Sequence, residues 1–156
     1  MLLIPLQKRF TLSLPSLVIS SATISFIVHT TEDSEKLITT VSDCFRLHGE
    51  EISKQELEGH FGNKMFYIKT HLTGERADRV SRMLLSKLQF SSKKRLMTDL
   101  EKYLNEHDAL YLRIDRQSLP EELVLGDDEA ILVKLKPKLR RDRKSVVRGF
   151  QEMMKA

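Results

Sequence analysis

Hydrophobic and polar residues alternate in five short stretches of the chain. In the first stretch, Ala22, Ile24, Phe26 and Val28 occupy every second position. Because successive side chains of a strand point to opposite faces, this spacing predicts a strand with one buried face. A glycine-containing connection at residues 60–63 is typical of a hairpin between the second and third stretches. The remaining strands are predicted over residues 51–58, 64–72, 110–115 and 130–137.

Apolar residues recur at three- and four-residue intervals in four other stretches, a pattern typical of helices with one buried stripe. The first helix is expected to start after the N-cap Thr31, to continue to about Leu47 and to end at Gly49. Thr73 and Gly74 are expected to open the second helix. The four stripes are Leu37, Ile38, Val41 and Phe45; Ala77, Val80, Leu84 and Leu88; Leu96, Leu100, Tyr103 and Leu104; and Val146, Val147, Phe150, Met153 and Met154.

The predicted order of elements is strand, helix, two strands, two helices, two strands, helix. This order neither alternates strictly nor separates helices from strands, so it favours an α+β fold with a largely antiparallel sheet and helices packed on one face. We expect a single α+β domain over residues 22–156, with the last helix packed on the sheet through Phe150.

The first 21 residues are apolar but are interrupted by Pro5, Lys8, Arg9 and Pro15. These interruptions make a membrane span a poor interpretation. We expect residues 1–21 to be a poorly ordered N-terminal extension, or sequence upstream of the true start. The alternative is a cleavable signal, since two basic residues precede an apolar, serine-rich run.

Composition narrows the class of protein. The chain has 156 residues, which is long enough to bury a core without disulfide bonds or metal ions. Its one cysteine, Cys44, cannot form an internal disulfide and is compatible with the reducing cytoplasm. We therefore expect a cytoplasmic protein that is not embedded in a membrane.

Positive charge is concentrated near the C-terminus. Between Lys134 and Arg148 there are eight Lys or Arg residues and one acid, which leaves 26 − 8 = 18 basic and 22 − 1 = 21 acidic residues elsewhere. A local excess of cations attracts polyanions such as RNA and gains from counterion release. The alternative is a lysine-rich edge strand that prevents aggregation.

The basic residues in this segment follow the predicted elements. Lys134, Lys136 and Lys138 alternate with apolar residues, so a strand would place their three ammonium groups on one face. Four more basic residues lie at the start of the last predicted helix, where positive charge interacts unfavourably with the helix dipole. Because this interaction lowers stability, it indicates another role for Arg140, Arg141, Arg143 and Lys144. Arg76, Arg79 and Arg82 of the second helix either extend this basic surface or form a solvated helix face.

Catalytic and metal-binding patterns are weak. The five histidines lack the spacing of metal ligands, although His29 and His71 lie on predicted strands that could approach one another. The sequence contains no phosphate-binding loop and no serine nucleophile motif. Glu56 and Glu58 share one side of a strand without a third acid, and the acidic residues 127–129 suit a solvated turn better than a cation site. We therefore expect neither an enzyme nor a cofactor or metal site.

Three segments carry a family resemblance: HTTED at residues 29–33, LEGHFGN at 57–63 and LYLRIDRQ at 110–117. Together they resemble an archaeal family of small RNA-binding proteins described as predicted exosome subunits, over roughly residues 22–155. The resemblance implies an α+β fold similar to a ribosomal-protein-type RNA-binding fold, that of a large-subunit ribosomal protein. It also implies RNA binding without known catalysis. Ser34 stands where the family often has proline, and serine serves equally well in a first helical turn.

Two of these motifs supply further candidate site residues. In a structural interpretation of residues 57–63, the glycines adopt positive φ and Phe61 packs down against the protein. In a functional one, His60 and Phe61 offer flat surfaces to an unpaired base and Asn63 bonds to a base edge. Arg116 follows a strand, where it either supports the fold or contacts phosphate, and Arg113 is expected to pair with a neighbouring strand.

The leading hypothesis is a non-catalytic RNA-binding protein, an accessory of an RNA-processing, exosome or ribosome-related assembly. One alternative is an interaction subunit whose basic surface binds an acidic partner protein. The other is a small hydrolase that uses His60 with an acid such as Glu58. The candidate RNA-binding residues are Lys134, Lys136, Lys138, Arg140, Arg141, Arg143, Lys144, His60, Phe61, Asn63 and Arg116.

Overall fold

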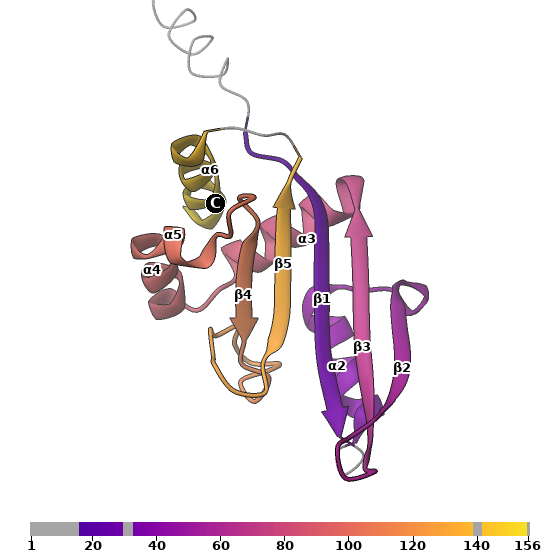
Figure 1. Cartoon of the computed structure of the whole chain (residues 1–156). Coiled ribbons are helices and arrows are strands. Elements are labelled where there is room, and N and C mark those ends of the chain that lie inside the picture. Colours follow the sequence, from indigo (N-terminus) through magenta and orange to yellow (C-terminus); the bar gives the residue numbers. More distant parts are fainter. Residues whose placement is uncertain (1–15, 30–32, 139–141, 156) are drawn as a thin grey trace, which may run out of the picture.

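The computed structural model describes residues 16–29, 33–138 and 142–155, and these build one twisted sheet with its helices (Figure 1). The strands and the longer helices follow the predicted order along the chain, with a short, unpredicted 3₁₀ turn before the second strand. The strands and helices are β1 (Ile19–His29), α2 (Ser34–Phe45), the short 3₁₀ turn η1 (Gly49–Glu51), β2 (Ile52–Glu58), β3 (Lys64–Thr73), α3 (Gly74–Ser86), α4 (Phe90–Thr98), α5 (Leu100–Tyr103), β4 (Leu110–Ile114), β5 (Ile131–Pro137) and α6 (Arg143–Lys155).

The sheet has the strand order β2-β3-β1-β5-β4, and each neighbouring pair is antiparallel. The first strand in the sequence is therefore the central strand of the sheet. Thr23 of β1 lies opposite His71 of β3 on one side and Lys134 of β5 on the other. The predicted α+β class with a largely antiparallel sheet is confirmed.

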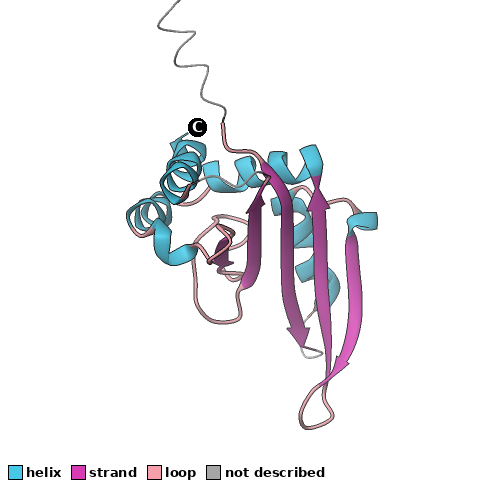
Figure 2. Ribbon diagram, turned by 45° about the horizontal axis from the view of Figure 1, so that its top comes forward, coloured by secondary structure: helices cyan, strands magenta, loops and turns pink. Residues whose placement is uncertain are grey.

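One face of the sheet is covered by helices. In Figure 1, α2 and α3 lie behind the strands, and α4, α5 and α6 gather beyond β4. Ala22, Ile24, Phe26 and Val28 of β1 are all buried on this helical face, as their alternation predicts. Figure 2, turned by 45° from Figure 1, again shows helices behind the strands and beside the sheet.

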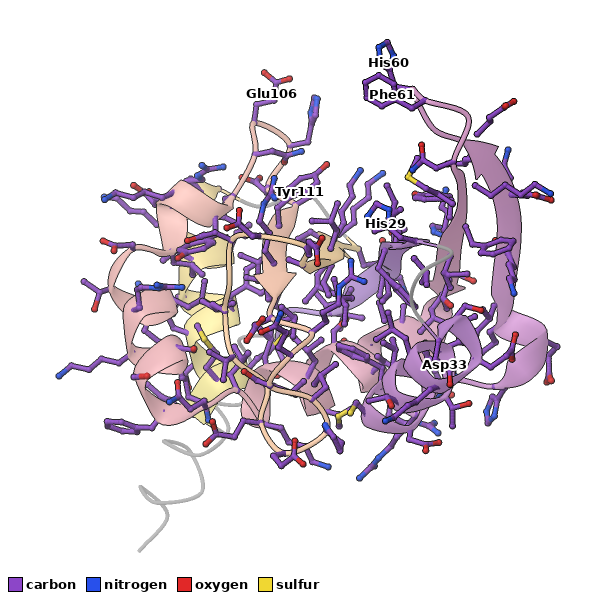
Figure 3. All side chains as sticks on the ribbon, turned by 90° about the horizontal axis from the view of Figure 1, so that it is seen from below. His29, Asp33, His60, Phe61, Glu106 and Tyr111 are labelled. Carbon is purple, nitrogen blue, oxygen red and sulfur yellow. The ribbon has the colours of Figure 1, made fainter. Side chains whose placement is uncertain are left out.

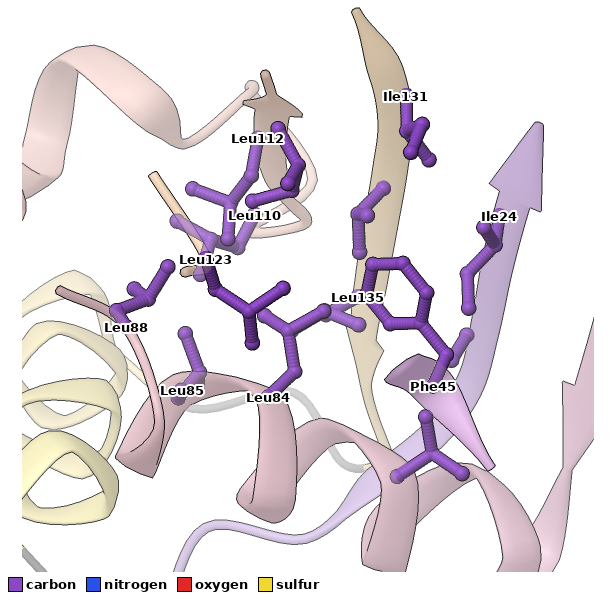
Figure 4. Packing of buried hydrophobic residues seen from close by; sticks show 14 of the residues in the cluster. Ile24, Phe45, Leu84, Leu85, Leu88, Leu110, Leu112, Leu123, Ile131 and Leu135 are labelled. Carbon is purple, nitrogen blue, oxygen red and sulfur yellow. The ribbon is translucent and has the colours of Figure 1, made fainter. Parts of the chain in front are cut away.

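The core lies between the sheet and the helices. Figure 4 shows Phe45 of α2 and Leu84 of α3 in one cluster with Ile24 of β1 and Leu135 of β5. Full burial of a side chain such as Phe45 stabilises the fold by about 1.5–3 kcal/mol. Phe150 is fully buried as expected, but α6 makes its main contacts with α3 and α4 rather than with the sheet.

Helix ends differ from the predicted ones where local hydrogen bonds compete. Thr31 lies outside the described residues, and the N-cap of α2 is Asp33, whose carboxylate accepts a hydrogen bond from Lys36 N at 3.1 Å. Arg46, with φ 55°, ends α2 three residues before Gly49, which instead opens η1. The predicted third helix is divided into α4 and α5 at Asp99.

The first strand begins before residue 22. Leu17 is buried and β1 begins at Ile19. Residues 1–15 of the expected extension lie outside the described residues. None of the helices in the described ranges is both long and apolar enough to cross a membrane.

Candidate nucleic-acid interface

Among the described residues, no helix covers the second face of the sheet. Its large side chains remain accessible: Ile27 of β1 exposes 39%, Leu132 of β5 44% and Tyr111 of β4 45% of their surface. We call this surface the open face. Its residues on β1, β3, β5 and β4, at alternate strand positions, include Ser21, Thr23, Ser25 and Ile27 of β1; Tyr67, Lys69 and His71 of β3; Leu132, Lys134 and Lys136 of β5; and Tyr111 and Arg113 of β4.

The open face is positively charged. It carries Lys69, Lys134, Lys136 and Arg113, and no residue of the five strands adds a carboxylate to it. The two acids of β2, Glu56 and Glu58, pair with Phe66 and Lys64. These positions belong to the helical face of the sheet and not to the open face. A positively charged surface whose strands carry no acidic side chain on that face raises the local concentration of anionic ligands.

An aromatic ring lies within this positive surface. Tyr111 faces Lys134 across the β4–β5 pair, and Lys134 Nζ lies 5.5 Å from the centre of the tyrosine ring. Next to them, the Thr23 hydroxyl and His71 Nδ1 are 2.9 Å apart. Cations, an accessible ring and hydroxyl groups are the groups that contact phosphate, base and ribose in RNA-binding sheets.

A groove of about 650 Å³ opens where the open face meets α5. Four cations reach its lining from four different elements: Arg95 of α4, Lys102 of α5, Arg113 of β4 and Lys134 of β5. One carboxylate, Asp127, also lines the groove. The sequence alone did not identify this groove, because its cations lie up to 39 residues apart along the chain.

The three strand lysines divide between two places. Lys134 and Lys136 are exposed and lie on the open face together, as predicted. Lys138 is also exposed, but it lines a separate hollow of about 380 Å³ with Arg79 and Arg82 of α3. Arg140 and Arg141 lie outside the described residues.

Arg143, at the start of α6, has structural partners. Its Nη1 donates to Asn105 O at 2.7 Å and to Asp108 Oδ1 at 2.9 Å, and its side chain is 37% exposed. This ion pair fixes the start of α6 to the turn that precedes β4. Lys144, the next residue, is exposed.

Arg116 also supports the fold. Its Nη2 donates to Ile27 O at 2.9 Å and its Nε donates to Glu129 O. These bonds hold the irregular segment between β4 and β5 against the end of β1. Arg113, which the sequence predicted to pair with a neighbouring strand, instead lies on the open face and donates to Asp127 O at 3.4 Å.

The β2–β3 hairpin presents an aromatic tip. Gly59 N donates to Asn63 O at 2.6 Å, Gly62 has φ 79°, and the Asn63 side chain lies over the Cα of Gly59. Phe61 is 92% exposed and makes an edge-on contact with His60, their ring centres 4.8 Å apart. The interpretation in which Phe61 packs down against the protein is therefore wrong, because a tight turn points the ring into solvent.

Figure 3 relates this tip to the rest of the open face. His60, Phe61 and Tyr111 project on the same side of the sheet, whereas Asp33 at the start of α2 lies on the other. The hairpin tip and the turn that carries Glu106 both rise beyond the strands on that side. The open face is thus bordered at both ends by projecting turns.

The arginine stripe of α3 does not extend the open face. Its helix packs on the helical face of β1 and β3. Arg76 donates to Glu51 at 2.9 and 3.0 Å, and Arg82 donates to Asp78 at 2.9 Å and to Leu17 O at 2.6 Å. Arg76 and Arg82 are paired with Glu51 and Asp78, and the stripe meets the basic segment at Lys138, in the hollow that Arg79 and Arg82 line, rather than at Lys136 on the open face.

His29 and His71, which the sequence places on two strands, lie far apart in the sheet. His29 lies opposite Met65 and His71 opposite Thr23, so the two histidines are about 20 Å apart at strand spacing. Within the described residues, no three His, Cys, Asp or Glu side chains gather closely enough to hold a metal ion. Burial, with the nearby carboxylates of Asp43 and Glu121, raises the pKa of the Cys44 thiol and makes it a poor nucleophile.

Comparison with known proteins gives one family and several structures. A family model described as RNA binding matches residues 21–139. The structure of a DUF54 protein from Archaeoglobus fulgidus is similar, with 29% identity, a TM-score of 0.71, and coverage of 86% of this chain and 99% of that one. No curated protein matches the chain.

Two further DUF54 structures share the fold. The protein from Sulfolobus solfataricus has 22% identity and a TM-score of 0.71, with coverage of 86% of this chain and 97% of that one. The protein from Methanothermobacter thermautotrophicus has 24% identity and a TM-score of 0.67, with coverage of 88% of this chain and 98% of that one.

Proposed function

The chain belongs to the family described as RNA binding, and on that premise we propose that it binds RNA on the open face of its sheet. The main support for the proposal is the positive charge of the open face. Four cations and an accessible tyrosine lie on a helix-free surface to which the strands contribute no carboxylate. Release of counterions from RNA phosphates provides the driving force.

The residues divide into two roles. Lys134, Lys136, Lys69 and Arg113 neutralise phosphates on the open face. The exposed Lys138 and Lys144 supply further cations, and Arg140 and Arg141, which lie outside the described residues, are included on the basis of the sequence. Arg143 and Arg116 position the segments that border the face, as their hydrogen bonds to backbone carbonyls indicate. Phe61 and His60 offer a stacking surface at the hairpin tip, which Asn63 shapes.

We extend the proposal to a setting: a non-catalytic, cytoplasmic accessory of an RNA-processing, exosome or ribosome-related assembly. The support is the family resemblance of its motifs and the single, poorly nucleophilic cysteine. Purification of the protein with its native partners, with and without RNase, tests this extension. Partners that persist after RNase are held by protein contacts, whereas partners that are lost are held by RNA.

Charge reversal on the open face tests the binding site directly. The variant Lys134→Glu/Lys136→Glu should lower affinity for a mixed single-stranded RNA more than tenfold at about 0.1 M salt, since it removes two phosphate contacts and adds repulsion. The matched control is Lys36→Glu/Lys87→Glu, which changes two exposed lysines on the helical side by the same charge. Both variants should remain folded, because exposed charges contribute little to stability.

Equal affinity of the two folded variants would overturn the proposal. In that case, stoichiometric binding of the protein to an acidic partner, reduced in Lys134→Glu/Lys136→Glu, would support the interaction-subunit alternative.

A further inference from the structure

We infer that the groove beside α5 is a pocket for one unpaired nucleotide, with its base stacked on Tyr111 and its phosphate held by the surrounding cations. This inference rests on the proposed RNA binding and adds the conformation of the RNA that is recognised. The same chemistry also fits a free nucleoside phosphate, and the experiment below separates the two sources.

The size of the groove suits a single small ligand unit. Its volume of about 650 Å³ falls within the roughly 300–1,000 Å³ of pockets that bind cofactors and small molecules. Its lining extends from α4 and α5 across β4 and β5 to the central strand β1. A ligand that fits it is therefore one nucleotide of a longer strand and not a whole duplex surface.

The charge of the groove selects an anion. Arg95, Lys102, Arg113 and Lys134 contribute four cations and Asp127 one carboxylate, a balance of 4 − 1 = +3. Arg95, Lys102 and Arg113 are exposed, so their guanidinium and ammonium groups can move to meet a phosphate. Charge-assisted hydrogen bonds from arginine to phosphate are among the strongest polar contacts that proteins make.

The aromatic side chains select a base. Tyr111 and Tyr103 both line the groove, and Tyr111 is 45% exposed. Lys134 Nζ, 5.5 Å from the ring centre, contributes a cation–π contact that helps to fix the position of the ring. In a duplex the flat faces of the bases are stacked on one another, so only an unpaired nucleotide can place its base on this ring.

Polar groups around the ring can recognise ribose and base edges. Thr23 and Asn105, both partly exposed, line the groove beside the buried Ser25. Asn105 Oδ1 accepts hydrogen bonds from His107 N and Ala109 N, both at 2.9 Å, which fixes the orientation of the amide. The remaining amide NH₂ group supplies donors of fixed direction, a requirement for recognition of a base or a 2′-hydroxyl.

The experiment compares four ligands on the whole chain: a short single-stranded RNA, a hairpin duplex of similar length, AMP and UMP. The chain has no tryptophan and three tyrosines, two of which line the groove, so tyrosine fluorescence reports the site directly. The single strand should bind at least tenfold more tightly than the duplex and quench the emission.

Three variants locate the binding. Tyr111→Ala should weaken single-strand binding about 5- to 150-fold, the usual loss for one stacked base, and should leave duplex binding unchanged. Tyr111→Phe should keep the affinity, since it keeps the ring. Phe90→Ala is the matched control, because Phe90 is an 81% exposed aromatic residue outside the groove lining.

The outcomes separate this inference from the proposed function. If RNA binds and is weakened by Lys134→Glu/Lys136→Glu but not by Tyr111→Ala, the nucleotide pocket is overturned and the RNA-binding face remains. If no RNA binds but AMP or UMP binds and is lost in Tyr111→Ala, the pocket takes a free nucleotide and the proposed function fails. If none of the four ligands binds, both are overturned.

Discussion

A phenylalanine that is 92% exposed gives almost nothing to the stability of the fold, because its ring buries little surface when the chain folds. Phe61 occupies the tip of a tight turn that is stabilised by backbone hydrogen bonds and by Gly62 at positive φ. Arg143 shows the opposite case, since its half-buried guanidinium is bound to Asp108 and to Asn105 O. At the scale of single residues, contacts therefore separate side chains free to bind a ligand from side chains that support the fold.

Replacement of Phe61 by alanine should change the free energy of unfolding by less than about 0.5 kcal/mol, as is usual at exposed positions. If the ring stacks on a base, affinity for single-stranded RNA should fall by about 1–3 kcal/mol. Urea unfolding and fluorescence anisotropy measure the two quantities. Phe90→Ala, a second exposed aromatic, should change neither. A clear loss of stability in Phe61→Ala would contradict the assignment of this ring to binding.

Two contacts fix helices of the helical face to neighbouring segments. Arg76 of α3 donates to both carboxylate oxygens of Glu51, and Glu51 Oε1 also accepts from His48 N at 2.8 Å. At Gly149, α6 approaches the segment before β1 so closely that an added Cβ would lie 2.5 Å from Leu17 Cβ. Each contact joins elements far apart in the sequence, so both contribute to the rigidity of the side opposite the open face.

The Glu51–Arg76 contact should make stability depend on acid pH. The hydrogen bond from Arg76 lowers the pKa of the Glu51 carboxyl below its ordinary value of 4.5. A lowered folded-state pKa means that the stabilisation is present above about pH 4.5 and is lost as the pH falls through the lower folded value. Glu51→Gln should therefore cost about 1 kcal/mol at pH 7 and much less at pH 3, as measured by urea unfolding. The control is Glu50→Gln, at the exposed neighbouring residue. It should change the free energy of unfolding little at either pH.

The close approach of Gly149 to Leu17 predicts that a larger side chain at position 149 destabilises the fold. Gly149→Val should lower the free energy of unfolding by about 1–3 kcal/mol, because the added atoms overlap buried Leu17. The same substitution at Gly49, whose added Cβ would meet nothing within 4 Å, should cost clearly less. Thermal or urea unfolding compares the two variants. Equal stability of the two would show that the segment around Leu17 moves away without cost.

The whole molecule has two unlike sides. Helices cover one side of the sheet, where Arg76 and Arg82 are paired with Glu51 and Asp78, whereas the open face carries four cations on strands that contain no acid. The formal net charge is only +4, so its distribution rather than its total creates a surface suited to a polyanion.

Salt should weaken RNA binding in proportion to the number of phosphates that the open face neutralises. For single-stranded RNA the slope is about −0.7 per phosphate, so contacts from Lys69, Lys134, Lys136 and Arg113 predict about −3 in log K against log salt. Fluorescence anisotropy from about 50 to 300 mM salt measures it. The Lys134→Glu/Lys136→Glu variant should flatten the slope by about 1.4, the share of two phosphates. A slope near zero in the wild type would exclude phosphate contacts as the source of affinity.

The sequence by itself determined the elements and which residues face inward. The alternation over residues 131–137 correctly placed Lys134 and Lys136 side by side on one face, and the stripe of α3 correctly predicted buried Ala77 and Leu84. These properties follow from the geometry of a single strand or helix and from the removal of apolar surface from water. Both properties depend only on neighbouring residues, so a pattern over about ten residues is enough to predict them.

Only the tertiary structure decided which face stayed open and which cations remained available. Arg143 lies at a helix start that looked suited to phosphate, yet its partner Asp108 is 35 residues earlier in the chain. Arg95 and Lys134 come from separate elements and line the same groove as Tyr111. No spacing in the sequence predicts that these residues lie close together. The order in which strands pair and the side on which helices pack bring such residues together, because these are set by the burial of the whole core rather than by any one segment.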